Sequence, residues 1–112
     1  MNLENLYSIL NTVLPTKVTY GINIYDNGEV IAMPYIVYQI RSERPKGYHD
    51  DKPIFYNSVV QITLVTKKKD LVLEKKLESI LLENDITYEL ISEFHNSDMS
   101  VNRVYEINME DF

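Results

Sequence analysis

The sequence contains no cysteine and only three glycines among its 112 residues. Without cysteine the chain can form no disulfide, and it has no thiolate for catalysis or metal binding. Gly21, Gly28 and Gly47 lie far apart, so they cannot form the glycine-rich loop that holds phosphate in the common nucleotide-binding motifs. These absences exclude thiol enzymes and the usual nucleotide-binding loops.

Long apolar runs are missing as well. No stretch approaches the roughly 20 consecutive apolar residues that span a bilayer, and the N-terminus lacks the basic and apolar segments of a signal peptide. We therefore expect a protein that is made in the cytoplasm and does not associate with a membrane.

Basic residues are outnumbered by acidic ones, 11 to 17, which gives a formal net charge of −6. Proteins that grip nucleic acid neutralise phosphates with lysine and arginine, so this balance argues against such a protein. It does not argue against one that surrounds DNA without gripping it. The apolar content of 45% and charged content of 25% are typical of a globular domain, and the length predicts a single domain over residues 1–112.

The clearest strand in the sequence covers residues 55–66. This stretch is rich in β-branched and aromatic residues and contains neither proline nor glycine. Val60, Ile62 and Leu64 make one face wholly apolar, so we place that face on the core.

Two amphipathic helices are predicted. Asn2 can cap a helix from residue 3 to about residue 14, which Pro15 ends, and Asp70 can cap a helix over residues 71–83. Apolar residues at helical spacing give each helix one buried stripe. The first stripe consists of Leu3, Leu6, Leu10 and Val13, and the second of Leu73, Leu77, Ile80 and Leu81. The solvent side of the second helix is expected to hold Glu74, Lys75, Lys76, Glu78 and Glu83.

The remaining strands are predicted from alternating apolar and polar residues. They cover residues 18–25, 35–41, 86–94 and 101–109, and a turn at residues 26–28 follows the first of them. The resulting order is α-β-β-β-α-β-β. Because most connections are short, we expect an α+β domain in which both helices pack on one face of an antiparallel twisted sheet of four to five strands.

One long irregular segment interrupts this pattern at residues 42–54, where two prolines and a glycine disfavour regular structure. We expect a protruding, mobile hairpin loop there that joins the 35–41 and 55–66 strands, because unstructured segments of this length in compact domains are usually functional or disordered. Its polar side chains and the lysine run after the 55–66 strand form the predicted interface. These residues are Arg44, Lys46, Tyr48, His49, Asp50, Asp51, Lys67, Lys68 and Lys69.

Catalytic groups are not apparent. His49 and His95 lie in different predicted loops, and neither belongs to a zinc-binding spacing. His49, Asp50 and Asp51 could hold a divalent ion, but a solvated acidic loop is the interpretation we favour. No serine lies in a nucleophile elbow, and no strand carries the acidic and lysine pattern of a restriction-type nuclease. We therefore expect no enzyme activity, no cofactor and no metal site.

Nine tyrosines are many for a chain of this length. Tyrosine is enriched at protein interfaces because it buries a large area while its hydroxyl remains polar. The alternative is that most of these rings cover the sheet. Tyrosines near strand ends, in a chain without catalytic groups, favour a binding module over an enzyme.

Four segments in the middle of the chain together resemble a known family. They are residues 34–38 (Pro-Tyr-Ile-Val-Tyr), the loop that ends at residues 49–51 (His-Asp-Asp), residues 59–67 (Val-Val-Gln-Ile-Thr-Leu-Val-Thr-Lys) and residues 70–82. In spacing and residue character they look like the small tail-completion or tail-terminator proteins of siphophages and prophages. The resemblance covers the layout of residues 3–109.

This resemblance implies a non-enzymatic structural protein of a bacteriophage virion. Such proteins form a ring, commonly a hexamer, at the head-proximal end of the tail. The ring ends polymerisation of the tail tube and joins the tail to the head connector, while DNA passes through its lumen. The implied partners are further copies of the chain, the tail-tube protein and a head-connector or neck protein, and assembly takes place in the bacterial cytoplasm.

Two alternatives stay open at this point. The related head–tail joining and neck proteins share the same layout, and a small acidic adaptor, acting as a monomer or dimer, would share the composition. A ring requires one patch to bind a different patch on the next subunit. We expect a sheet edge to contribute, formed either by residues 29–33 or by the last strand.

Overall fold

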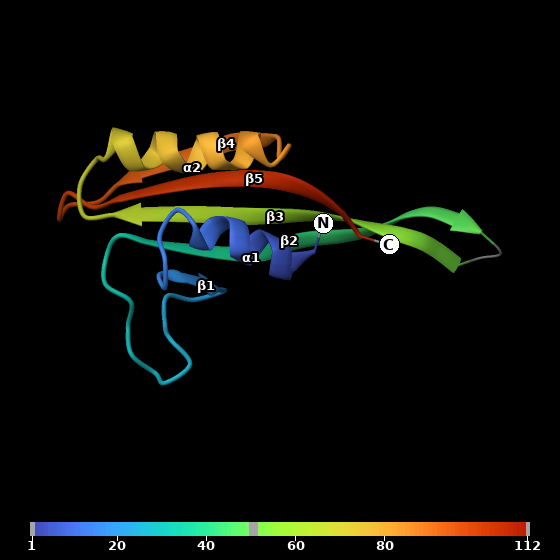
Figure 1. The fold of residues 1–112 in the computed structure, drawn as a ribbon, viewed down its shortest axis with the longest axis horizontal. Helices are drawn as coiled ribbons and strands as arrows, with labels where there is room; N and C mark the ends of the chain where they lie inside the picture. The colour runs from blue at the N-terminus through green and yellow to red at the C-terminus, as the bar shows by residue number, and fades with distance from the viewer. Residues whose placement is uncertain (1, 50–51, 112) are drawn as a thin grey trace.

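The computed structural model describes the backbone of residues 2–49 and 52–111 and the side chains of residues 2–42 and 58–109 (Figure 1). It confirms the predicted element order and the α+β class. The elements are α1 (Leu3–Asn11), β1 (Val18–Tyr20), β2 (Tyr35–His49), β3 (Lys52–Thr66), α2 (Leu71–Glu83), β4 (Tyr88–His95) and β5 (Val101–Asp111).

The five strands form one sheet in the order β1-β2-β3-β5-β4. Three neighbouring pairs are antiparallel, whereas β1 pairs with β2 in parallel, so the sheet is mixed and not wholly antiparallel as predicted. The chain leaves β1 at Gly21, whose φ of +83° is readily adopted only by glycine. Residues 21–34 then return along the sheet, so that β2 starts beside β1 and runs in the same direction.

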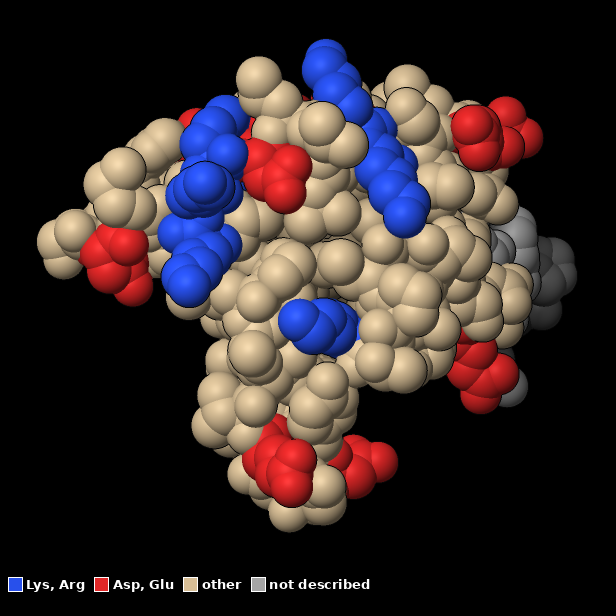
Figure 2. All heavy atoms as spheres, turned by 60° about the vertical axis from the view of Figure 1, so that its left-hand side comes forward, with Lys and Arg blue, Asp and Glu red and all other residues tan. Residues whose placement is uncertain are grey.

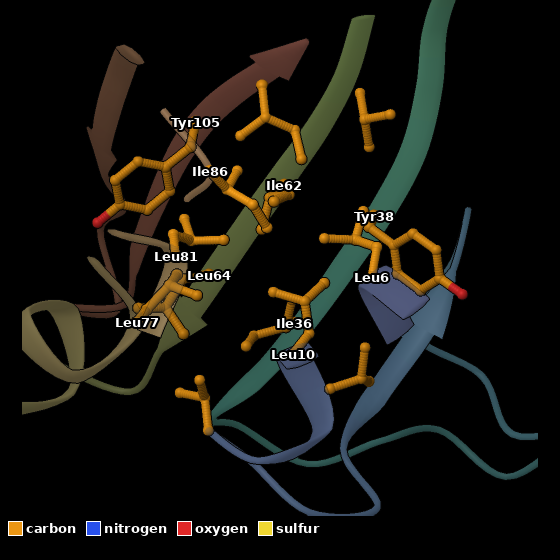
Figure 3. Close-up of a cluster of buried hydrophobic side chains, with 14 of the residues drawn as sticks. Leu6, Leu10, Ile36, Tyr38, Ile62, Leu64, Leu77, Leu81, Ile86 and Tyr105 are labelled. Atoms are coloured by element: carbon orange, nitrogen blue, oxygen red, sulfur yellow. The ribbon is translucent and has the colours of Figure 1, made fainter. Parts of the chain in front are cut away.

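Both helices pack on the same face of the sheet, and the core lies between them and the central strands (Figure 3). Val60, Ile62 and Leu64 of β3 are at most 1% exposed, which confirms the predicted core face. The other fully buried side chains of this cluster come from both helices, β2 and β5, and include Leu6, Leu10, Ile36, Leu77, Leu81, Tyr105 and Ile107.

The helix boundaries follow from their caps. Asn2 and Asp70 cap α1 and α2 as predicted, each accepting a hydrogen bond from the backbone N–H three residues later. Helix α1 ends at Asn11, earlier than predicted, because the Thr12 hydroxyl and N–H both donate to the Ile9 carbonyl. Val13, beyond the helix, is still only 2% exposed.

The predicted irregular loop at residues 42–54 is wrong for the part that the structure describes. Strand β2 continues to His49 and β3 begins at Lys52, and the two form one long hairpin that extends well beyond the helices (Figure 1). A two-stranded ribbon has free edges on both sides, so Pro45 can be accommodated where its missing N–H costs no ladder bond. Asp50 and Asp51 lie outside the described residues.

The sheet edges also differ from expectation. Strand β5 lies between β3 and β4, so the last strand is internal and β4 is the edge. Residues 29–33 form no strand, although Val30 makes an isolated bridge to Ile24. Strand β1 stops at Tyr20 instead of residue 25, and β4 begins at Tyr88 and bulges between Leu90 and Ser92.

The Asp26–Gly28 turn is confirmed. The Gly28 N–H donates to the Tyr25 carbonyl at 2.8 Å, and Gly28 has a φ of +90°. The connection between β1 and β2 therefore contains a small, internally hydrogen-bonded turn.

Of the helices in the described part of the chain, none is long and apolar enough to cross a membrane.

Replacing Asp70 with alanine should lower the free energy of unfolding by about 1 kcal/mol, because the α2 N-terminus loses the acceptor that lies 3.1 Å from the Leu73 N–H. Urea denaturation of the purified chain measures this loss. The matched control is Asp70→Asn, which keeps a side-chain oxygen and should stay within a few tenths of a kcal/mol of the wild type. Equal stability of the alanine variant and the wild type would contradict the capping role.

Candidate functional site

The predicted interface residues do not form one site. Four of them, Arg44, Lys46, Tyr48 and His49, belong to the backbone of the β2–β3 hairpin, and their side chains lie outside the described residues together with Asp50 and Asp51. The three lysines, Lys67, Lys68 and Lys69, follow the end of β3 at the opposite end of the long axis (Figure 1). Lys67 and Lys68 are exposed, whereas Lys69 is held by two carboxylates.

Those two carboxylates belong to an ion cluster that joins α2 to β4 and β5. The Lys69 ammonium lies 2.9 Å from Glu74 and 2.7 Å from Glu93. The Arg103 guanidinium lies 2.6 Å from the same Glu93 oxygen and 3.2 Å from Glu78. We define the ion cluster as Lys69, Glu74, Glu78, Glu93 and Arg103.

Glu74 was expected on the solvent side of α2, but the structure buries it to 3% exposure. The reason is its position against Lys69 and Arg103, which neutralise a carboxylate that would be costly to bury alone. The residue whose position in the sequence indicates this cluster is Arg103, because it shares a strand face with Tyr105 and Ile107. A charged side chain on the core face of a strand requires carboxylate partners from the element that covers it.

Tyr105 links the ion cluster to the core. Its ring is fully buried, and its hydroxyl donates to Glu78 at 2.7 Å and accepts from Arg103 at 2.7 Å. Burial raises the pKa of Tyr105, and the hydrogen bond to Glu78 raises it further. Figure 3 shows its hydroxyl pointing away from the cluster of apolar side chains.

Two carboxylates of the cluster, Glu93 and Glu78, are held in the charged form by their neighbours. Hydrogen bonds from Lys69, then His95 and then Arg103 lower the pKa of Glu93 to about 2. Burial by itself would raise the pKa of Glu78, but hydrogen bonds from Tyr105 and Arg103 outweigh it, and the pKa is lowered. Each carboxylate of the ion cluster thus lies beside at least one cation, and the cluster acts as a structural connection between a helix and two strands.

A second feature is a pocket of about 500 Å³ on the opposite side of the molecule, between α1, β1, β2 and the 21–34 connection. Four of its nine lining residues are tyrosines, and its lining contains no basic side chain. The lining residues are Tyr7, Tyr20, Tyr25, Tyr38, Thr16, Thr19, Val18, Ile24 and Asp26. We call it the tyrosine pocket.

Three of its rings form a packed group around Tyr38. The Tyr20 ring meets the Tyr38 ring edge to face at 5.3 Å between centroids, and the Tyr7 ring lies at 6.5 Å. The Tyr20 hydroxyl accepts a hydrogen bond from the Ile40 N–H at 3.2 Å, which fixes the Tyr20 ring beside β2. Burial, followed by the neighbouring Tyr7 and Tyr20 hydroxyls, raises the pKa of Tyr38.

Asp26 reaches this pocket because of the turn in the 21–34 connection. The Tyr25 N–H donates to the Glu29 carbonyl at 2.8 Å, and the Ile31 N–H donates to the Asn23 carbonyl at 2.9 Å. The Glu29 N–H also donates to the Asn27 side chain at 3.0 Å. These bonds hold the backbone of the turn in place, and Asp26 lies in this turn at the lining of the pocket.

Exposed apolar side chains gather on two edges of the molecule. One group surrounds the tyrosine pocket and consists of Tyr7, Tyr20, Ile22, Ile24 and Val30; we call it the β1 edge. The other lies on the outer side of α2 and on β4 and consists of Leu71, Val72, Leu82, Leu90, Ile91 and Phe94; we call it the β4 edge. Because β1 and β4 are the two end strands of the sheet, these edges lie on opposite sides (Figure 1).

The part of the chain that the structure describes contains no group of three or more histidine, aspartate or glutamate side chains arranged to hold a metal ion. A scan against protein-family models gives no match, and no curated protein matches the sequence.

The low pKa of Glu93 predicts a specific pH dependence. A carboxylate whose pKa is lower in the folded than in the unfolded chain stabilises the fold above the unfolded pKa, and this contribution disappears as the pH falls towards the folded value. The free energy of unfolding should therefore decrease between about pH 5 and pH 2. In Glu93→Gln this decrease should be clearly smaller.

Urea denaturation at a series of pH values measures the effect. Glu83→Gln is the control, because Glu83 is an exposed glutamate at the far end of α2 and outside the ion cluster. The same slope in wild type and Glu93→Gln would contradict the assignment.

Proposed function

We propose that this protein is a non-enzymatic structural protein whose copies associate through their opposite edges into a closed ring, as in the tail-terminator and tail-completion proteins of siphophages. In this role the ring ends polymerisation of the tail tube and joins the tail to the head connector. A hexamer is the ring size that the resemblance implies.

The observation that carries the proposal is the position of the exposed apolar side chains. Ring closure needs two different patches on each subunit, set so that the next copy continues in the same rotational sense. The β1 edge and the β4 edge are such a pair, since they differ in composition and lie at opposite ends of the sheet. Val30 is 69% exposed on one edge and Val72 is 82% exposed on the other.

The sheet face opposite the helices supports this choice of edges. Gln39, Gln61 and Glu106 lie side by side in register across β2, β3 and β5, and Arg41 pairs with Glu106. A polar row of this kind remains in water without cost, so this face needs no partner. The apolar surface left to be covered is therefore concentrated at the edges.

Strand β4 supplies a further means of association. Among the described residues it pairs only with β5, and its outer edge presents unpaired backbone N–H and C=O groups over Tyr88–His95. Such an edge readily accepts a strand from another chain. The β2–β3 hairpin reaches beyond the helices, and we assign to it a contact with a neighbouring subunit or with the tail-tube or connector ring.

The acidity of the chain fits passage of DNA through a ring. A net charge of −6 per subunit repels phosphates, so DNA would slide through the lumen instead of binding to it.

The alternative proposal is an acidic adaptor that binds one partner as a monomer or dimer. The tyrosine pocket favours it, because a single aromatic pocket is sufficient to capture one partner segment. The two proposals differ in the mass of the free protein.

Light scattering coupled to gel filtration, over a range of concentrations, tests the ring. We expect a species of about six times the 13.2 kDa of the chain. Val72→Glu places a charge on the β4 edge and should convert this species to monomers, because a charge buried in an interface without a partner is unfavourable.

The control is Met99→Glu, an equally drastic change at a residue that is 73% exposed in the β4–β5 turn and belongs to neither edge. It should keep the wild-type mass. A wild-type chain that is a monomer or dimer at every concentration contradicts the ring and supports the adaptor.

A further inference from the structure

The tyrosine pocket has the chemistry of a site for an organic cation. Aromatic ring faces carry negative electrostatic potential and attract ammonium or guanidinium groups. Here Tyr7, Tyr20 and Tyr38 supply neighbouring rings, and Asp26 adds a carboxylate to the lining. A volume of about 500 Å³ is ample for the alkyl stem and head group of a lysine.

Charge complementarity identifies where that cation comes from. The 21–34 connection carries Asp26 and Glu29 and no basic residue. Figure 2 shows acidic side chains at the tip of the lower projection, whereas most of the basic side chains in this view lie on its upper part, beside several acidic ones. The proposed ring brings the β1 edge of one subunit, which includes this projection, to the β4 edge of the next subunit.

Beside the β4 edge, α2 carries two exposed lysines. Lys75 and Lys76 lie three and four residues after Val72, so all three share the outer face of the helix. Lys69 is not available in this way, because it is bound by Glu74 and Glu93 in the ion cluster.

We propose that the tyrosine pocket of one subunit receives the ammonium group of Lys75 or Lys76 from α2 of the next subunit. Val72 then packs against the apolar residues around the pocket, such as Ile22 and Ile24, while the lysine stem enters between the tyrosine rings. This inference rests on the proposed ring, and it names the contact that sets the direction of assembly.

Two blocked variants test the proposal. Asp26→Lys blocks the pocket and leaves α2 intact, whereas the double change Lys75→Glu and Lys76→Glu blocks α2 and leaves the pocket intact. Each variant alone should raise the concentration at the midpoint of assembly by at least about tenfold, measured by light scattering. A 1:1 mixture of the two should assemble more readily than either variant alone, because the intact pocket of one variant accepts the intact α2 of the other.

The control is the double change Lys67→Glu and Lys68→Glu, which makes the same change in charge at two exposed lysines outside α2. It should assemble like the wild type. Circular dichroism of every variant shows whether the fold is retained, and none of these side chains is buried.

The aromatic contribution is tested separately with Tyr7, which is 39% exposed. Tyr7→Phe keeps the ring face and should assemble like the wild type, whereas Tyr7→Leu should weaken assembly.

If the wild type forms rings and both blocked variants form them equally well, the pocket proposal is overturned and the ring proposal stands. A wild-type chain that does not assemble overturns the ring proposal and, with it, the proposal for the tyrosine pocket.

Discussion

The packing of two helices side by side on one face of the sheet determines most other features of the molecule. Leu6 and Leu10 of α1 and Leu77 and Leu81 of α2 are fully buried against β2, β3 and β5. Because the two helices are short, the outer sides of the end strands β1 and β4 are left at the margins of the core (Figure 1). The same packing therefore produces both the stable centre and the two apolar edges.

Two tyrosines mark the limits of this core. Tyr105 and Tyr38 lie at opposite sides of the apolar cluster, and both hydroxyls point away from it (Figure 3). On one side the Tyr105 hydroxyl donates to Glu78 of the ion cluster, in which every carboxylate contacts a cation, and this connection fixes α2 on the sheet. On the other side Tyr38 lines an open pocket with an acidic residue. One side is thus closed and structural, while the other is available to a partner.

Local patterns were sufficient to predict the elements whose ends are set by nearby residues. Asp70 and the spacing of Leu77 and Leu81 predicted α2 with its observed limits, because the cap and the stripe are both local. The hairpin connection between β2 and β3 was predicted, but the continuation of both strands into residues 42–49 and 52–54 was missed, since two prolines and a glycine disfavour strands in general. The parallel β1–β2 pair was also missed, because it depends on the path of residues 21–34.

The candidate site could be predicted only in part. The tyrosine content indicated an interface, but the residues that were singled out lie at two separate ends of the molecule. Tyr7, Tyr20 and Tyr38 come from three different elements, so only the tertiary fold brings their rings together. Arg103 on a core-facing strand position was a usable signal for the ion cluster, whereas nothing local indicated that Glu74 would be buried beside it.

The central claim is that the β1 edge of one copy meets the β4 edge of the next, and engineered disulfides test it most directly because the chain has no cysteine of its own. A chain carrying both Ile22→Cys and Val72→Cys should give, after mild oxidation, a ladder of covalent oligomers on a denaturing gel that ends at the ring size. Either single variant should stay monomeric. A double variant that gives no ladder, or single variants that give dimers as readily, would contradict the account.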